Sequence, residues 1–404
     1  MIITDFAPNI TKRDAILALK LLFQPLRWRR GKSKQYIKRR LKFRFFGSDS
    51  QISTFLTGRA ALYQYLKNLN LNVGDEILVQ GFTCEAVVLP ILKLNLKPIY
   101  VDINSDDYSM NINDLKKKYS NRSKVIVLQH TFGISPKYQT EITLFAKKHK
   151  IEIIHDVAHG FDPEKFHMKK YEGTILMSFG RSKAFSSVFG GAIISQNKKT
   201  TTKMRDMERQ LTLPSYWFIF KILIYQPQAY LIKLTYNIWI GKIIHAFLNY
   251  FGLILKEITT REKKGEFDIT FLHSFPNVCA LLLLQQLDTF NDVVDRRTAA
   301  VDYYNNNIVN NSIKYSGPLS RYPLVVGDQK KTLNRSSSKG VLLGSWYTQP
   351  VAPKELDLEQ VGYIRGSCPV AEKINNKIIN LPTNITLDEV KKVTAVINDE
   401  LNHQ

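Results

Sequence analysis

The strongest signal in this chain of 404 residues is the stretch Ser178-Phe-Gly-Arg-Ser-Lys-Ala-Phe-Ser-Ser-Val-Phe-Gly-Gly191. Its lysine, Lys183, stands among small hydroxyl residues, after an apolar run and before a Gly-Gly turn. This setting suits an amine held in a cleft, and such an amine can form a Schiff base with an aldehyde or ketone. We therefore take Lys183 as the candidate reactive residue. From this stretch alone, an ordinary loop lysine is the alternative.

Upstream of this stretch, short apolar strands alternate with helical segments from Thr54 onward. This alternation predicts an α/β fold with a mostly parallel sheet covered by helices on both faces. The predicted strands are residues 77–80, 98–102, 124–130 and 151–156. Asp156 ends the last of them, and α/β proteins bind ligands at the carboxyl edge of the sheet. Because Asp156 and Lys183 follow successive strands, we expect both to face one pocket.

A possible anion site lies at the start of a predicted helix. The segment Thr57-Gly-Arg-Ala-Ala-Leu62 places Thr57 at the N-cap, where its hydroxyl can accept a backbone hydrogen bond. The first amides of a helix have no partner within it, and the helix dipole favours an anion there. Thr57 and Gly58 are therefore candidates for binding a phosphate. An ordinary capped helix is the alternative reading.

Composition indicates a globular protein with one large and one smaller domain, because 44% of the residues are hydrophobic. The three cysteines, Cys84, Cys279 and Cys368, lie far apart, so they favour neither a metal site nor a disulfide framework. The first residues lack the pattern of a secretory signal, so we expect a cytoplasmic location. The predicted divisions are a basic N-terminal arm (1–48), a large domain (49–295) and a small C-terminal α+β domain (296–404).

The formal net charge of +22 predicts attraction to anions. Lysines and arginines crowd residues 32–44, where they alternate with aromatic and aliphatic side chains. This mixture is found at membrane surfaces and in nucleic-acid-binding proteins. It also occurs in solvated helices whose long basic side chains cover apolar neighbours. Of the three, we expect nucleic-acid binding least.

Residues 214–256 form an apolar insert rich in tryptophan and tyrosine. Pro227, Gly241 and four lysines are expected to divide it into pieces shorter than the roughly 20 residues of a membrane-spanning helix. Short aromatic helices with outward lysines suit the headgroup zone of a bilayer. Our hypothesis is peripheral attachment to the anionic inner face of the cell membrane. A dimer interface or a buried helical layer is the alternative.

Six motifs cover much of residues 50–200 and a stretch near the C-terminus. They are Thr57-Gly-Arg-Ala-Ala-Leu62, Val73-Gly-Asp-Glu-Ile77, Val101-Asp-Ile103, His155-Asp-Val-Ala-His159, Ser178-Phe-Gly-Arg-Ser-Lys183 and Ile379-Asn-Leu-Pro-Thr383. In their order and spacing they resemble the DegT/DnrJ/EryC1/StrS aminotransferases, which are sugar aminotransferases of the fold type I pyridoxal-phosphate class.

The resemblance implies that Lys183 binds pyridoxal 5'-phosphate covalently and then moves protons between the substrate carbon and the cofactor. It also implies that Asp156 bonds the pyridine nitrogen, which keeps the ring protonated and able to accept negative charge. Some relatives have a histidine in place of the lysine and act as dehydratases. Lys183 argues against that activity here.

The resemblance assigns further cofactor contacts. Thr57, Gly58 and Arg59 match the segment that cradles the phosphate, and Ser178 matches a serine that also contacts it. His159 lies where relatives commonly have a glutamine beside the ring oxygen of the cofactor. Both side chains can donate one hydrogen bond at that place.

Two positions depart from the family pattern. Cys84 occupies the place of an aromatic residue that covers the cofactor ring, and Phe82 is a candidate substitute. The loop with which relatives reach the phosphate of the neighbouring subunit is replaced by Leu272-His-Ser-Phe-Pro-Asn277. His273, Ser274 and Asn277 are the polar residues available there, and no role is carried over to them.

Together, these features predict a homodimeric aminotransferase that moves an amino group onto a keto sugar carried on a nucleotide or on a lipid. Glutamate as the amino donor is implied by the resemblance. The alternative is a protein that binds the membrane surface and has kept the fold without turnover, and the two departures motivate it.

Overall fold

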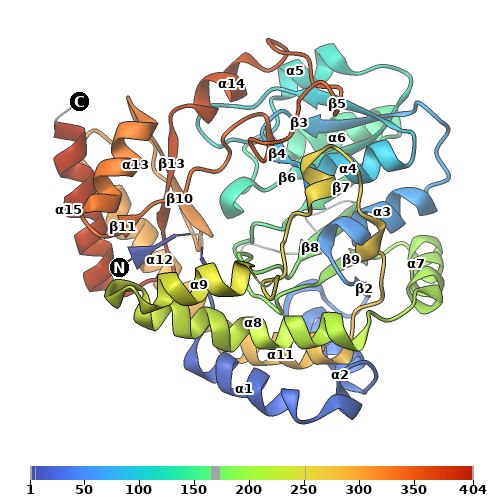
Figure 1. Cartoon of the computed structure of the whole chain (residues 1–404). Coiled ribbons are helices and arrows are strands. Elements are labelled where there is room, and N and C mark those ends of the chain that lie inside the picture. The colour runs from blue at the N-terminus through green and yellow to red at the C-terminus, as the bar shows by residue number, and fades with distance from the viewer. Residues whose placement is uncertain (1, 5, 165–172, 251, 403–404) are drawn as a thin grey trace.

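Seven strands form the central sheet of the computed structural model, which describes residues 2–4, 6–164, 173–250 and 252–402 (Figure 1). The predicted arm (1–48), large domain (49–295), apolar insert (214–256) and small domain (296–404) each contain at least one residue outside the described ranges. The sheet order is β2 (Gln51–Phe55), β9 (Gly191–Ser195), β8 (Thr174–Ser178), β7 (Glu152–Asp156), β6 (Ser123–Gln129), β3 (Glu76–Gln80) and β5 (Lys97–Val101). The strands from β8 to β5 are parallel, and β9 is antiparallel to both neighbours. The prediction of a mostly parallel sheet is confirmed.

The sheet is buried on both faces because its central strands are apolar at successive positions. In β3, Ile77 and Val79 join one apolar cluster, whereas Leu78 joins another. Successive side chains of a strand point to opposite faces, so each face has its own core. The covering helices are α3 (Gly58–Asn68), α4 (Glu85–Lys93), α5 (Ile112–Lys118), α6 (Gln139–His149) and α7 (Lys198–Gln210).

The C-terminal part packs helices against a two-stranded antiparallel sheet. Its elements are α12 (Phe290–Asn307), β10 (Arg321–Val325), α13 (Gln329–Ser338), β11 (Val341–Leu342), β12 (Val351–Ala352), α14 (Pro369–Asn375), β13 (Ile378–Pro382) and α15 (Leu387–Asn402). The N-terminal strand β1 (Ile2–Ile3) pairs in parallel with β11. The chain therefore begins in contact with its C-terminal region. The domain boundaries stay a prediction.

The predicted basic arm packs closely against the rest of the protein. It contains α1 (Lys12–Leu22), η1 (Pro25–Arg27), α2 (Ser33–Leu41) and the π-helix η2 (Lys42–Phe46). α1 packs against α8 (Tyr216–Thr235), and α2 packs against α11 (Asn277–Asp288). Lys34 and Lys38 bind the buried carboxylate of Glu208 at 2.9 and 2.6 Å. Part of the positive charge is therefore used inside the fold, where a buried carboxylate needs a cation.

The apolar insert forms α8 (Tyr216–Thr235), η5 (Tyr236–Ile238) and α9 (Ile240–Tyr250). The expected break at Pro227 is wrong, because this proline lies inside α8, a continuous helix of 20 residues. Its packing explains this: α8 lies beside α1 (Figure 1) and buries Ile219, Ile222 and Leu223 in the core. The expected division near Gly241 is found, because α8 ends at Thr235 and α9 begins at Ile240, one residue before Gly241. Within the described ranges, no helix combines the length and apolarity that crossing a membrane needs.

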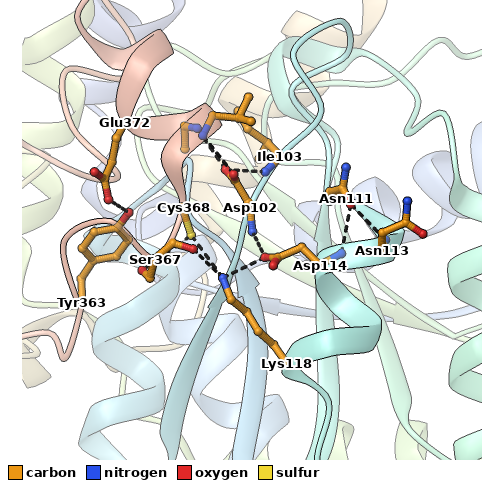
Figure 2. Close-up of polar contacts among 12 residues, drawn as sticks. Asp102, Ile103, Asn111, Asn113, Asp114, Lys118, Tyr363, Ser367, Cys368 and Glu372 are labelled. Atoms are coloured by element: carbon orange, nitrogen blue, oxygen red, sulfur yellow. Dashed lines mark hydrogen bonds and ion pairs between the residues drawn. The ribbon is translucent and has the colours of Figure 1, made fainter.

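A carboxylate at the end of β5 joins the sheet to the C-terminal region (Figure 2). Asp102 accepts hydrogen bonds from the amides of Val370 and Ala371, at 2.9 and 3.0 Å, and so caps the start of α14. Its own amide donates to Asp114 at 2.7 Å, and Asp114 in turn binds Lys118 at 2.8 Å. Asp102 is therefore a structural residue within the Val101-Asp-Ile103 motif.

We predict that Asp102→Ala lowers the free energy of unfolding by about 1–3 kcal/mol, because two buried amides lose their acceptor. Urea unfolding measures this change. The control is Asp106→Ala, which removes an exposed carboxylate bound to Lys137 at the surface and should cost less than about 1 kcal/mol. Equal urea midpoints for Asp102→Ala and the wild type would show that the cap contributes nothing.

Candidate active site

A cavity of about 430 Å³ lies at the carboxyl edge of β7 and β8. This is the edge at which ligands bind in α/β sheets. All eight site residues predicted from the sequence line it: Thr57, Gly58, Arg59, Cys84, Asp156, His159, Ser178 and Lys183. Residues separated by up to 126 positions in the chain thus meet around one space.

The parallel pairing of β7 with β8 brings the two principal residues together. Asp156 is the last residue of β7, and Ser178 is the last residue of β8, five positions before Lys183. One oxygen of Asp156 accepts from the amide of Ala158 at 2.9 Å, and within the described ranges the other oxygen has no partner. Burial raises the pKa of Asp156, whereas the bond from Ala158 and the charge of Lys183 oppose this rise. A buried carboxylate in this position favours a cationic or hydrogen-bond-donating ligand.

The start of α3 forms the other end of the cavity. The hydroxyl of Thr57 accepts from the amide of Ala60 at 3.1 Å and so caps this helix of 11 residues. The preceding amides, those of Gly58 and Arg59, have no acceptor within the helix. Gly58 also permits a close approach, because a β-carbon there would lie 3.1 Å from the β-carbon of Ser178. Backbone amides and a hydroxyl thus converge where a phosphate is expected.

The side chain of Arg59 is already occupied by protein groups. Its guanidinium binds the buried carboxylate of Glu262 and lies 3.7 Å from that of Glu85. It also donates to the backbone oxygen of Glu257 at 2.8 Å. Two buried carboxylates match its charge, so we assign to the anion site only the backbone amide of Arg59.

Glu85 is a cavity residue that the sequence analysis did not identify. Burial raises its pKa from 4.5 to about 7, against the attraction of Arg59 and with a further contribution from Glu262. The only signal in the sequence was a charged side chain beside Cys84 at the opening of an apolar helix. Its pairing with Arg59 depends on how α3 and α4 pack together.

The aromatic rings that line the cavity come from the C-terminal region of the chain. Phe82, the candidate substitute for the missing ring, is fully buried behind the cavity, with its ring 5.2 Å from that of Tyr347. Trp346 and Tyr347 line the cavity instead, and the amine of Lys183 lies 5.5 Å from the Trp346 ring centre. Cys84 also lines it, and burial raises the pKa of its thiol to about 12, which keeps it neutral.

His159 and Tyr347 form a hydrogen-bonded pair at the cavity, and the proton positions of this pair can be assigned. Nδ1 of His159 accepts from the amide of Phe132 at 3.1 Å, and burial lowers the pKa of His159 well below its ordinary value. A neutral imidazole whose Nδ1 is an acceptor carries its proton on Nε2. That nitrogen lies 2.9 Å from the hydroxyl of Tyr347 and donates to it. The hydroxyl hydrogen of Tyr347 is therefore available to another acceptor.

The polar residues of the 272–277 loop lie outside this cavity. Asn277 accepts from the amide of Ser33 at 3.1 Å, and Ser274 accepts from Lys34 at 2.8 Å. His273 lies 3.0 Å from the hydroxyl of Thr212. These side chains hold the N-terminal segment and the residues that follow α7 in place.

Known proteins match the chain at the level of sequence. The family model described as "DegT/DnrJ/EryC1/StrS aminotransferase family" matches residues 11–217 and 247–398. The chain is 25% identical over 256 residues to GDP-perosamine synthase of Escherichia coli O157:H7, which covers 63% of this chain and 58% of that protein. It is 23% identical over 247 residues to UDP-4-amino-4-deoxy-L-arabinose--oxoglutarate aminotransferase of Shewanella sediminis, covering 61% and 54%. The matched regions thus span less than two thirds of these relatives.

Solved structures share the fold over almost the whole chain. The Helicobacter pylori aminotransferase PseC matches with a TM-score of 0.73 at 18% identity, covering 99% of this chain and all of that chain. The Bacillus subtilis protein NtdA, solved with bound cofactor PMP, matches with a TM-score of 0.72 at 17% identity, covering 98% and 84%. At these identities the likeness establishes the fold, and the predicted fold type I architecture is confirmed.

The raised pKa of Glu85 predicts a pH-dependent stability. The folded protein holds this proton up to about pH 7, whereas the unfolded chain releases it near 4.5. The stability that the protonated Glu85 carboxyl contributes is therefore complete below pH 4.5 and is lost as the pH rises to about 7. The free energy of unfolding falls by at most roughly 3 kcal/mol over this range. We expect Glu85→Gln to remove this loss in urea unfolding followed between these pH values. Identical pH profiles for the variant and the wild type would contradict the assignment.

Proposed function

Because the chain belongs to the DegT/DnrJ/EryC1/StrS aminotransferase family, we propose that it is a pyridoxal-phosphate-dependent aminotransferase acting on a nucleotide-linked keto sugar. The observation that carries this proposal is the presence of Lys183 and Asp156 in one cavity, next to the anion site at the start of α3.

The residues of the cavity fit pyridoxal 5'-phosphate. Asp156 would offer the ring nitrogen a carboxylate oxygen that has no partner among the residues that the structure describes. Thr57, Gly58 and Ser178 would hold the phosphate, and Lys183 would supply the amine that binds the aldehyde carbon. When bound, this cofactor supplies an electron sink for the negative charge that develops on the substrate carbon.

Lys183 has the central chemical role in this proposal, because its amine can remove and return a proton at the substrate carbon. Its loop is held firmly by the insert. Arg181 stacks on the ring of Tyr225 in α8 at 4.0 Å and donates to the backbone oxygen of Leu255. The amide of Arg181 also donates to the carboxylate of Glu257 at 2.8 Å. Such anchoring keeps a reactive group in its working position.

Tyr347 and His159 have a positioning role in the proposal. The tautomer of His159 directs the free hydrogen of Tyr347 to an acceptor other than His159, and Tyr347 lines the cavity. An oxygen of the cofactor ring or of the sugar is a suitable acceptor. Burial raises the pKa of Tyr347 well above its ordinary value, so the hydroxyl stays a donor throughout the working pH range.

The finer parts of the proposal concern donor, assembly and location. Glutamate as donor is supported by the relative whose name contains oxoglutarate, and a sugar nucleotide as acceptor by the GDP- and UDP-sugar names of the relatives. We further propose a homodimer and association with an anionic membrane surface. The alternative is a membrane-binding protein that has kept the fold without turnover. One of the two departures that motivate it, the missing aromatic residue at Cys84, is offset by the rings of Trp346 and Tyr347 in the cavity.

We predict that the purified protein with added pyridoxal 5'-phosphate shows a visible absorption band that borohydride removes. Lys183→Ala should lack this band and lose at least about a thousandfold in amino transfer, because the proton-moving group is gone. Lys354→Ala, which removes another lysine of the cavity, is the matched control and should keep the band. A wild-type protein that stays colourless with added cofactor would refute the enzymatic proposal.

For Tyr347→Phe, we predict a retained absorption band whose pH dependence is shifted and a kcat lowered roughly tenfold, as expected for one lost hydrogen bond. Spectrophotometric pH titration and steady-state kinetics measure these effects. Tyr63→Phe serves as the control, because that ring stacks on Phe267 outside the cavity. An unchanged pH profile in Tyr347→Phe would rule out the positioning role.

A further inference from the structure

The positive charge of the chain is concentrated in two segments. Residues 15–48 contain eleven lysines and arginines and no acidic residue, and residues 209–256 contain five and again none. The net charge of the whole chain is +22. α1 of the first segment lies beside α8 of the second, and both contribute to the same apolar cluster (Figure 1). One layer of the fold therefore contains most of the excess charge.

Two helices of this layer expose apolar side chains at the same spacing. In α9 these are Ile240, Ile243, Phe247 and Tyr250, with exposed fractions from 48% to 86%. In and after α1 they are Ile16, Leu19, Phe23 and Leu26, with exposed fractions from 41% to 92%. Intervals of three, four and three residues place the α9 set on one side of that helix. In the other set, Ile16 and Leu19 lie on one side of α1, Phe23 is its C-cap and Leu26 lies in η1. We call these eight residues, together with Ile238 and Trp239, the apolar stripes.

Lysine amines lie next to the exposed tryptophans of the insert. The amine of Lys242 is 3.9 Å from the ring centre of Trp239, and that of Lys221 is 5.3 Å from the ring of Trp217. Both tryptophans are more than half exposed. A tryptophan at the level of the headgroups with an amine next to it matches the chemistry of a bilayer surface, where lipid phosphates bind the amine.

Catalysis does not account for this surface. The family model leaves residues 218–246 unmatched, which comprise most of α8, all of η5 and the start of α9. None of the residues in the apolar stripes lines the catalytic cavity. Because exposed apolar area of this kind is unfavourable in water, we expect it to have a binding partner.

We propose that the apolar stripes dock on an anionic phospholipid bilayer. The argument for lipid over a second copy of the chain is electrostatic. A symmetric contact would bring together two layers that are rich in lysine and arginine and whose segments 15–48 and 209–256 contain no acidic residue. Anionic headgroups instead neutralise this charge, while the stripes enter the boundary of the acyl chains. The inference rests on the location included in the proposed function and is independent of its chemistry.

Vesicle flotation of the full-length, cofactor-loaded protein tests this inference. We expect flotation with vesicles of equal parts phosphatidylcholine and phosphatidylglycerol, weaker flotation with phosphatidylcholine alone, and release by high salt. The double variant Ile243→Ser, Phe247→Ser should lower the partition coefficient by at least about tenfold, because two exposed apolar groups are lost.

The matched control is Val73→Ser, Ile364→Ser, which removes two side chains that are each 75% exposed elsewhere on the protein and should leave flotation unchanged. Light scattering and the visible band are recorded on the same samples. A yellow, folded wild-type protein that floats with neither vesicle overturns the docking inference and leaves the enzyme proposal intact. Flotation of a colourless protein supports docking and counts against the enzyme. Conversion of a dimer to a monomer by the stripe variant, without loss of flotation, assigns the stripes to a second copy.

Discussion

The parallel pairing of β7 with β8 is the constraint on which the site depends. It places the end of one strand, with Asp156, beside the end of the next, from which a short loop leads to Lys183. Parallel strands require both faces to be covered, and the two apolar clusters on either side of the sheet meet this requirement. The position of two chemical groups is thus determined by burial of the strands that precede them.

The two helices of the insert differ in how they relate to the core. α8 buries one face in the core and supports the loop that contains Lys183 through the stacking of Arg181 on Tyr225. α9 contributes little to the core and exposes one side to solvent. Of the two readings of this segment, a buried helical layer describes α8, whereas the exposed stripe of α9 is where a partner or a bilayer would bind. Removing the whole insert would therefore disturb both roles at once.

Two buried carboxylates beside the cavity share one cation, Arg59. Arg59 lies between Glu85 and Glu262 and connects α3, α4 and the segment that follows α9. This arrangement removes the Arg59 guanidinium from the ligand site, although its backbone amide remains at the start of α3. A single arginine cannot fully satisfy two buried carboxylates, which is consistent with the raised pKa of Glu85.

The sequence by itself determined the α/β class, four parallel strands of the sheet and, with the family resemblance, eight of the residues that line the cavity. These follow from local patterns, namely apolar strands ending in polar residues and motifs in a fixed order. The sequence did not determine that α8 continues through Pro227, because packing against α1 and the core outweighs the local preference of proline. Nor did it identify Tyr347 or Glu85 as cavity residues, or the pairing of Lys38 with Glu208. Each of these depends on contacts between segments far apart in the chain, and only the tertiary structure decides which of them meet.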